Sequence, residues 1–184
     1  IAKELGIKYV KIQKRNPLLC VPREQMNRPK ITPWGKMTYL EYKYKIEFSE
    51  SQIKELIEYS NEIDMILFAS VWDIDSARLM AKYTNICKIG SPCITDLELC
   101  KLCRELFPVL IVSTGMSTEN QIVNCLEICM PNVIMHTNST YPSPIEDLNL
   151  NYIHHLKEKW TDAEIGYSGH DLALETTYCA IGMG

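Results

Sequence analysis

A short apolar run that starts at Asn85 carries Lys88 and ends at Gly90 and Ser91. Such a run is typical of a buried strand in a parallel sheet. A glycine lets backbone approach a ligand closely, and a serine supplies a small hydroxyl. Together with the lysine charge, these groups suit a phosphate or a carboxylate. Taken alone, a lysine at a strand end is more often a snorkelling or ion-paired residue, so the interpretation depends on the rest of the chain.

Similar polar residues follow the other predicted strands. Lys11 and Gln13 are two apart in the predicted strand 7–13, so they point the same way. Two polar groups aimed into an apolar interior need a partner, whereas past the buried part of the strand they need none. We favour the interpretation that Lys11 and Gln13 point into a functional site. The other polar residues at strand ends are Ser70, Lys88, Ser91, Ser113, Ser139, Tyr141, Ser168 and His170.

The elements that must position these residues alternate along the chain. Apolar runs predict strands at 7–13, 65–70, 85–90, 109–113, 132–135 and 163–167, and amphipathic patterns predict helices at 50–62, 75–83, 95–106, 118–130, 148–160 and 172–182. This alternation predicts a parallel sheet with helical crossovers. A doubly wound sheet binds its ligand at one switch point, whereas a TIM (β/α)8 barrel carries its site after every strand. We therefore predict an α/β fold, an incomplete TIM barrel with about six βα units.

Composition places the chain among ordinary globular proteins. Its 184 residues are 46% hydrophobic and 23% charged, enough for one domain with a sizeable core. The net charge of -4 argues against a nucleic-acid-binding surface. No run reaches the ~18 apolar residues of a membrane span, and no signal peptide opens the sequence. We expect a cytoplasmic protein with no nucleic-acid or membrane partner.

The eight cysteines fall mostly inside predicted strands and helices, so we expect reduced thiols. Cys100 and Cys103 have the spacing of a redox or zinc motif, but both lie on the apolar face of a predicted helix, which favours core thiols. His136 also ends a predicted strand, and we expect packing there or support of a neighbouring ligand. His154 and His155 lie on a predicted helix and should be at the surface.

Residues 14–48 form a long, proline-rich connection. Loops of this length in a compact domain are usually functional or disordered. Trp34 and Tyr39 favour a packed lid over disorder, although both could simply pack the loop. A mixed helical run at 40–46 follows, and Ser49 is a plausible N-cap of the next helix.

Seven motifs together resemble one family. They are VKIQKR at 10–15, PWGKMTYLEYKYKIEFS at 33–49, FASVWD at 68–73, KIGSP at 88–92, STGMS at 113–117, TYPSPIEDLNL at 140–150 and IGYSGHD at 165–171. In order and spacing they resemble the N-terminal barrel of the N-acetylneuraminate (sialic acid) synthase family, across essentially the whole chain.

The resemblance implies a transferase that condenses phosphoenolpyruvate with an open-chain N-acetylated amino sugar, typically N-acetylmannosamine. The products are a nine-carbon 2-keto acid and phosphate. It also implies a divalent metal, Mn²⁺ or Mg²⁺, which polarises the aldehyde as a Lewis acid. Full-length members are domain-swapped homodimers, so a homodimer is expected for a full-length protein.

The resemblance also assigns roles to the residues at the strand ends. Lys11 and Lys88 supply charge, and with Tyr141 they are the candidate catalytic residues. His170 corresponds to one of the family's two metal-ligand histidines. The implied substrate-binding residues are Gln13, Ser70, Ser91, Ser113, Ser139 and Ser168.

The sequence departs from the family in places. It begins at Ile1 rather than at a methionine and stops at Gly184 where another strand is due, so we expect a piece of a longer protein. The family's first strand, its closing strands with the second metal histidine, and its C-terminal antifreeze-like domain are expected outside residues 1–184. Many members carry an acidic residue where this chain has Cys93, which leaves legionaminic or pseudaminic acid precursors open as acceptors.

Two other classes of function compete with this interpretation. Lys11 or Lys88 could be the nucleophile of a Schiff-base aldolase on the same fold. Alternatively, the missing barrel strands could indicate a non-catalytic interaction module. We favour the synthase because several motifs match together.

Overall fold

The computed structural model describes residues 1–184 and divides them into two compact units, Ile1–Thr84 and Asn85–Gly184. All six predicted parallel strands are present, with bounds shifted slightly in most of them. No helix is both long and apolar enough to cross a membrane.

The first unit is built on two parallel strands, β1 (Tyr9–Lys14) and β4 (Ile66–Val71), with helices α4 (Glu50–Glu62) and α5 (Ile74–Met80) packed on β4. A capping box begins α4, where the Ser49 hydroxyl accepts the Gln52 amide hydrogen and the Gln52 side chain accepts that of Ser49. The predicted N-cap is thereby confirmed.

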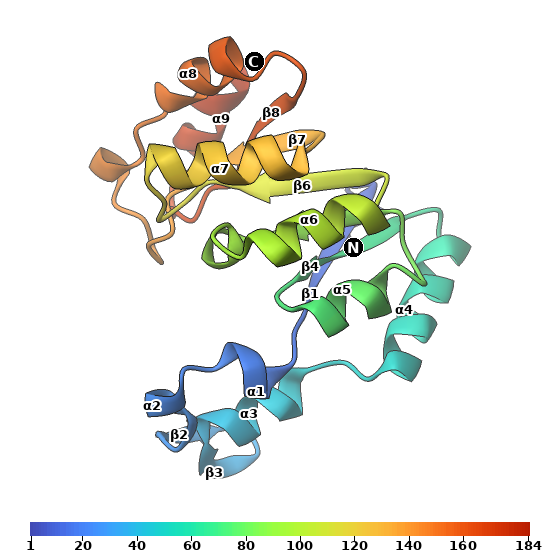
Figure 1. The fold of residues 1–184 in the computed structure, drawn as a ribbon. Helices are drawn as coiled ribbons and strands as arrows, with labels where there is room; N and C mark the ends of the chain where they lie inside the picture. Colours follow the sequence, from blue (N-terminus) through green and yellow to red (C-terminus); the bar gives the residue numbers. More distant parts are fainter. The chain divides into compact units, whose positions relative to one another are not determined.

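The connection between β1 and α4 is a folded lobe (Figure 1). Its elements are α1 (Pro17–Cys20), α2 (Arg23–Met26), the antiparallel pair β2 (Pro29–Thr32) and β3 (Gly35–Thr38), and α3 (Tyr39–Ile46). Gly35 has φ of +102°, a conformation that glycine adopts without strain, directly after the two-residue turn of the hairpin. The sequence predicted packing and the helical run here but missed the hairpin.

The second unit contains four parallel strands, β5 (Ile86–Ile89), β6 (Val109–Ser113), β7 (Val133–His136) and β8 (Glu164–Tyr167), paired in that order. Its helices are α6 (Leu97–Leu106), α7 (Glu119–Cys129), α8 (Tyr152–Lys159) and α9 (Leu174–Gly182), and 3₁₀ turns span Ser91–Cys93 and Ile145–Asp147. Figure 1 shows α6 and α7 along one face of these strands. The predicted helix 148–160 starts late, because Asn149 is left-handed with φ of +46°.

The strands of the second unit have two different faces. The face toward α6, α7 and α8 carries fully buried Cys87, Leu110 and Ile134. The opposite face carries Lys88, which is paired in register with Ile111 of β6. Paired residues of parallel strands point to the same side, so the strand register alone separates a packing face from a polar face.

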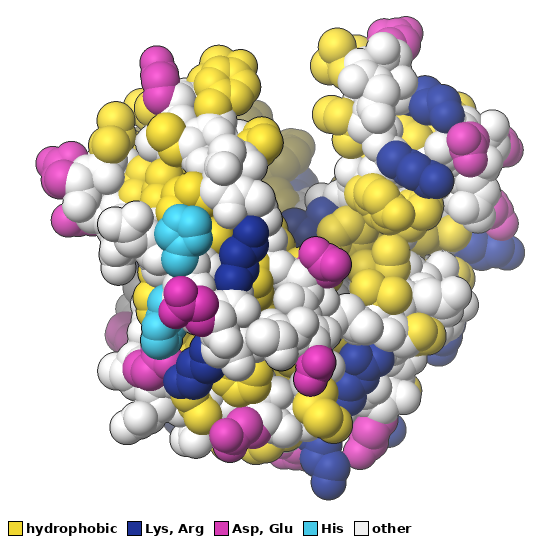
Figure 2. Space-filling view, turned by 90° about the horizontal axis from the view of Figure 1, so that it is seen from above, with side chains coloured by type: hydrophobic (Ala, Val, Ile, Leu, Met, Phe, Trp, Pro, Cys, Tyr) yellow, Lys and Arg dark blue, Asp and Glu magenta, His cyan; other side chains and the backbone are white.

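The charged side chains are interspersed on the surface drawn in Figure 2, where Lys and Arg alternate with Asp and Glu and apolar side chains lie among them. This mixing agrees with the small net charge of -4.

Candidate functional site

The first unit carries three of the predicted site residues on one face of its two strands. Gln13 is paired in register with Ser70, and Lys11 lies two residues before Gln13. Ser70 is buried, whereas Lys11 and Gln13 are exposed. Surrounding protein atoms partly desolvate the ammonium and lower the pKa of Lys11 from its ordinary value. The three side chains are thus available together at the carboxyl ends of β1 and β4.

The second unit brings Lys88 and Ser168 together. Lys88 Nζ lies 3.4 Å from Ser168 Oγ, although the two residues are 80 positions apart in the sequence. Ser168 follows β8, and its backbone N–H donates to the carbonyl of His136 at 2.9 Å, which fixes the start of the loop. The pair places one ammonium and one hydroxyl where β5 and β8 end, a combination suited to an anion.

Ser91 and Ser139 meet at a glycine. The Gly115 N–H donates to Ser91 Oγ at 3.0 Å. A Cβ at position 115 would lie 2.9 Å from both Ser91 Oγ and the Thr137 carbonyl oxygen, and closer still to Ser139 Oγ. Only glycine allows the two serine hydroxyls to approach the backbone in this way.

Ser113 is the last residue of β6, and the surroundings of its side-chain hydroxyl are unusual. The side chain is buried at 2% exposure, and its Oγ has no hydrogen-bond partner. Buried hydroxyls are nearly always paired, so an unpaired one marks a position where a ligand or water group can bind. Ser113 is thus the predicted residue whose surroundings point most directly to a missing partner.

His170 and Tyr141 form a stacked pair. Their ring centroids are 3.9 Å apart, and the Tyr141 hydroxyl lies 2.6 Å from His170 Nε2. His170 Nδ1 lies 2.6 Å from the Asn138 carbonyl oxygen, which can only accept. We infer that Nδ1 carries the proton and that the single lone pair of Nε2 accepts from Tyr141; in the same tautomer this lone pair could bind a metal only in place of the Tyr141 hydroxyl.

The described residues do not by themselves make a metal site. Among residues 1–184 there is no group of three or more His, Cys, Asp or Glu side chains that could hold a metal ion. Asp171, next to His170, is engaged elsewhere, since its carboxylate accepts from Tyr167 at 2.8 Å and from Thr176. The metal role of His170 stays a prediction, and it requires further ligands from outside this chain.

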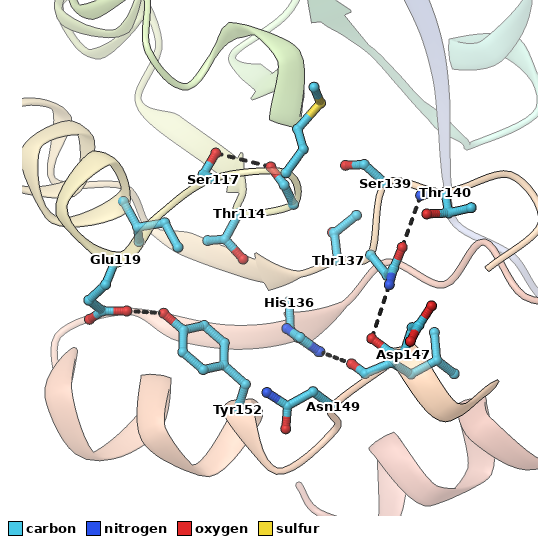
Figure 3. Close-up of a pocket in the computed structure, with 15 residues that line it drawn as sticks. Thr114, Ser117, Glu119, His136, Thr137, Ser139, Thr140, Asp147, Asn149 and Tyr152 are labelled. Atoms are coloured by element: carbon cyan, nitrogen blue, oxygen red, sulfur yellow. Dashed lines mark hydrogen bonds between the residues drawn. The ribbon is translucent and has the colours of Figure 1, made fainter. Parts of the chain in front are cut away.

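A pocket of about 680 Å³ lies beside Ser139, between the loops that follow β6 and β7 (Figure 3). Its floor includes buried Ile122, His136 and Leu148. Ser139 is its only predicted site residue. The pocket residues that sequence reasoning missed as a site include Thr114, Ser117, Glu119, Asn149 and Tyr152.

Glu119 holds one wall of this pocket together. Its carboxylate binds Lys159 Nζ at 2.6 Å and His155 Nε2 at 3.3 Å, and it accepts a hydrogen bond from the Tyr152 hydroxyl. The hydrogen bond with Lys159, followed by that with Tyr152, lowers the pKa of Glu119 to about 2. These partners tie the start of α7 to α8.

The remaining histidines lie where the sequence predicts. His136 is buried and its Nε2 lies 2.7 Å from the Leu148 carbonyl oxygen, which confirms the packing role. Burial lowers the pKa of His136, so the ring is neutral near pH 7. His154 and His155 are exposed on α8 as predicted, although His155 also contacts Glu119.

Comparison with known proteins agrees with the resemblance seen in the sequence. The chain matches the NeuB family over residues 1–184. It is 31% identical to an N-acetylneuraminate-9-phosphate synthase of Drosophila melanogaster, covering 100% of this chain and 51% of the relative. It is 26% identical to an N,N'-diacetyllegionaminic acid synthase of Campylobacter jejuni, covering 100% of this chain and 58% of the relative. The chain thus spans little more than half the length of these relatives.

A solved structure shares the fold. The N-acetylneuraminic acid (sialic acid) synthetase of Leptospira borgpetersenii, crystallised with citrate, superposes with a TM-score of 0.88 at 23% identity, covering 100% of this chain and 61% of that one. This likeness confirms the predicted fold class, an α/β fold of the TIM-barrel type that is incomplete within these residues.

Proposed function

Because this chain belongs to the NeuB family, we propose that it forms part of a synthase that joins phosphoenolpyruvate to an N-acetylated amino sugar. The proposed products are a nine-carbon sialic-acid-type 2-keto acid and phosphate. The observation that carries the proposal is the polar face of β5–β8, where Lys88 Nζ lies 3.4 Å from Ser168 Oγ. Ser113, on the same face, offers a buried hydroxyl without a partner. One ammonium with several hydroxyls suits the phosphate and carboxylate of phosphoenolpyruvate.

In the proposed reaction, C3 of phosphoenolpyruvate forms a bond to the aldehyde carbon of the open-chain sugar. The aldehyde oxygen takes up a proton, and water adds to the positive C2 and releases one, which leaves a hydroxyl on C2. The resulting tetrahedral intermediate loses phosphate by cleavage of its C2–O bond to phosphate, and the C2 hydroxyl gives its proton to the departing phosphate and becomes the ketone. Lys88 and the serine hydroxyls would hold the phosphate that departs, and these groups act without reorganisation because the strands fix them.

The other predicted residues have supporting roles in this proposal. Tyr141 and Ser139 would contact the sugar or the enolpyruvate group, and Lys11, Gln13 and Ser70 keep the roles that the resemblance implies. His170 would supply one ligand to Mn²⁺ or Mg²⁺, with the remaining ligands from outside residues 1–184. When bound, that metal would supply Lewis acidity. A cytoplasmic homodimer remains a prediction for the full-length protein.

The experiment uses the full-length protein that contains this chain, with phosphoenolpyruvate and N-acetylmannosamine, with and without Mn²⁺. We expect phosphate release that depends on the sugar and on the metal, with a nine-carbon keto acid detected by mass spectrometry. Release at full rate after chelation would remove the metal from the proposal. If no acceptor, including 2,4-diacetamido sugars, gives phosphate release, the synthase function is wrong.

The lowered pKa of Lys11 favours a second candidate, a Schiff-base aldolase. A Schiff-base nucleophile must be an uncharged amine, and a lowered lysine pKa is a shift in that direction; borohydride would then trap an adduct with pyruvate. For a synthase we expect no mass gain on the protein after treatment with pyruvate and borohydride. An adduct that maps to Lys11 would instead establish the aldolase.

A further inference from the structure

His170 has the hydrogen-bond arrangement of a metal ligand. A ligating histidine usually donates its other ring N–H to a carbonyl or a carboxylate, which fixes the tautomer and the orientation of the ring. Here Nδ1 donates to the Asn138 carbonyl oxygen at 2.6 Å, and the ring is half-buried. Nε2 therefore keeps a lone pair for a partner, and His170 fits the ligand role that the proposed function gives it.

The Tyr141 hydroxyl occupies this lone pair. It lies 2.6 Å from His170 Nε2, and the two rings stack with their planes at 25°. An imidazole nitrogen has a single lone pair, so Nε2 cannot accept from Tyr141 and bind a metal ion at the same time. The side chain of Tyr141 and a metal ion thus compete for the same atom of His170.

The contacts around the pair show which of the two side chains can move. Tyr141 is 76% exposed, and its hydroxyl makes no other hydrogen bond. The backbone on both sides of it is anchored, since the Thr140 N–H donates to Asn138 Oδ1 at 2.9 Å and the Ser143 N–H donates to the His170 carbonyl at 3.1 Å. Rotation of the Tyr141 side chain away from His170 frees Nε2 without a change in the loop or in the histidine ring.

We propose that Tyr141 is a positioning residue that holds His170 until a divalent metal ion displaces its hydroxyl, and that the displaced side chain then contacts substrate. The inference rests on the proposed function, in which His170 is a metal ligand and Tyr141 contacts the sugar or the enolpyruvate group. Because the hydrogen bond between the two side chains must break for each metal ion bound, Tyr141 lowers the affinity of the site for metal. In return, the Tyr141 hydroxyl becomes available to substrate only when metal is bound, which couples the two binding events.

The test measures Mn²⁺ binding to the full-length protein by calorimetry, without substrates. We expect Tyr141→Phe to bind Mn²⁺ about fivefold more tightly, the factor that corresponds to one neutral hydrogen bond, because phenylalanine keeps the ring but does not compete for Nε2. Tyr178→Phe is the matched control, since Tyr178 is exposed on α9 and its hydroxyl makes no hydrogen bond. The control should keep the affinity of the unmodified protein. An unchanged or weaker affinity of Tyr141→Phe would overturn the inference, because a tyrosine that only supports the ring of His170 would weaken metal binding when removed.

A second measurement follows the tyrosine itself. In protein labelled with fluorotyrosine, the fluorine NMR signal that is missing from Tyr141→Phe reports the surroundings of Tyr141, and diamagnetic Mg²⁺ should shift it. A signal that stays in place while Mg²⁺ binds would rule out displacement of the side chain.

His170→Ala tests the premise of the inference and should weaken Mn²⁺ binding. If it leaves the affinity unchanged, His170 is not a metal ligand and the inference is wrong. Phosphate release by the unmodified protein with phosphoenolpyruvate and acceptor sugar tests the synthase function separately, so failure of the one is distinguishable from failure of the other.

Discussion

The two faces of strands β5–β8 place small polar atoms in opposite settings. On one face, the Ser168 hydroxyl lies 3.4 Å from the ammonium of Lys88, and Ser113 lies on the same face. On the other, the thiols of Cys87 and Cys103 lie 3.9 Å apart with neither exposed. Serine and cysteine differ by one atom, so their chemistry alone does not explain the difference. Their surroundings determine their roles, because hydroxyls beside a cation can bind anions, whereas thiols among apolar groups fill space in the core.

Several buried thiols of α6 and α7 lie close to one another. Cys125 Sγ lies 3.5 Å from Cys100 Sγ and 3.8 Å from Cys129 Sγ. The hydrogen bond with Cys100 raises the pKa of Cys125, and that with Cys87 raises the pKa of Cys103, with burial adding to both. All eight cysteines are free, which confirms the predicted reduced thiols. Cys100 and Cys103 are both fully buried, which confirms the interpretation of these two residues as core thiols.

The largest effect should come from removing the cation of the polar face. In the full-length protein we expect Lys88→Met to reduce kcat/KM for phosphate release by roughly 1,000-fold, because the phosphate loses its charge-assisted partner. The melting temperature should change little, since the methionine keeps the apolar stem. Lys101→Met, on the exposed face of α6, is the matched control and should keep full activity. A Lys88→Met enzyme within about threefold of the unmodified rate would show that the two faces do not differ in function.

An intermediate effect should come from placing an oxygen among the helix thiols that cover the packing face. Cys125→Ser introduces a strongly polar hydroxyl at a fully buried position whose neighbours are thiols. We expect the free energy of unfolding, measured with urea, to fall by about 1–3 kcal/mol. Cys179→Ser, at an exposed position on α9, should change it by less than about 0.5 kcal/mol.

The complementary variant is Ser113→Ala on the polar face. It removes a buried hydroxyl that has no partner in the structure, so stability should stay the same or rise. The affinity for phosphoenolpyruvate should fall instead. If Cys125→Ser proves neutral and Ser113→Ala destabilising, the assignment of the two faces is reversed.

Much of this arrangement could be predicted from the sequence, because strands and their ends are local features. Alternating apolar runs located all six strands, and Gly90 and Ser91 marked the end of one of them. The pairing of Lys88 with Ser168 could not be predicted without a fold, since 80 positions separate them. The pocket was missed for the same reason: Glu119 and Tyr152 come from different helices, and each alone resembles a surface residue. The hairpin of residues 29–38 was missed because its prolines argue against strands.

The smallest effect should come from Glu119, a charged residue at the start of α7, on the side of the strands that the helices cover. The pKa of Glu119 is depressed from 4.5 to about 2, so its stabilisation is full above about pH 5 and disappears as the pH falls toward 2. The side chain is 42% exposed, and screening by solvent limits the contribution to about 1 kcal/mol or less. Urea unfolding of Glu119→Gln and of the unmodified chain should give free energies of unfolding that differ by this contribution at pH 7 and by roughly half of it at pH 3.

Glu127→Gln, at an exposed position of the same helix, supplies the control and should change the free energy of unfolding at pH 7 by less than Glu119→Gln does. The kcat/KM of Glu119→Gln with the preferred acceptor should stay within about threefold of the unmodified enzyme, because the carboxylate acts mainly by tying α7 to α8. A difference in stability that grows as the pH falls would have the wrong sign for a depressed carboxyl pKa. A large loss of activity without a loss of stability would instead show that Glu119 takes part in function. The pocket that Glu119 lines would then contain both packing and binding residues.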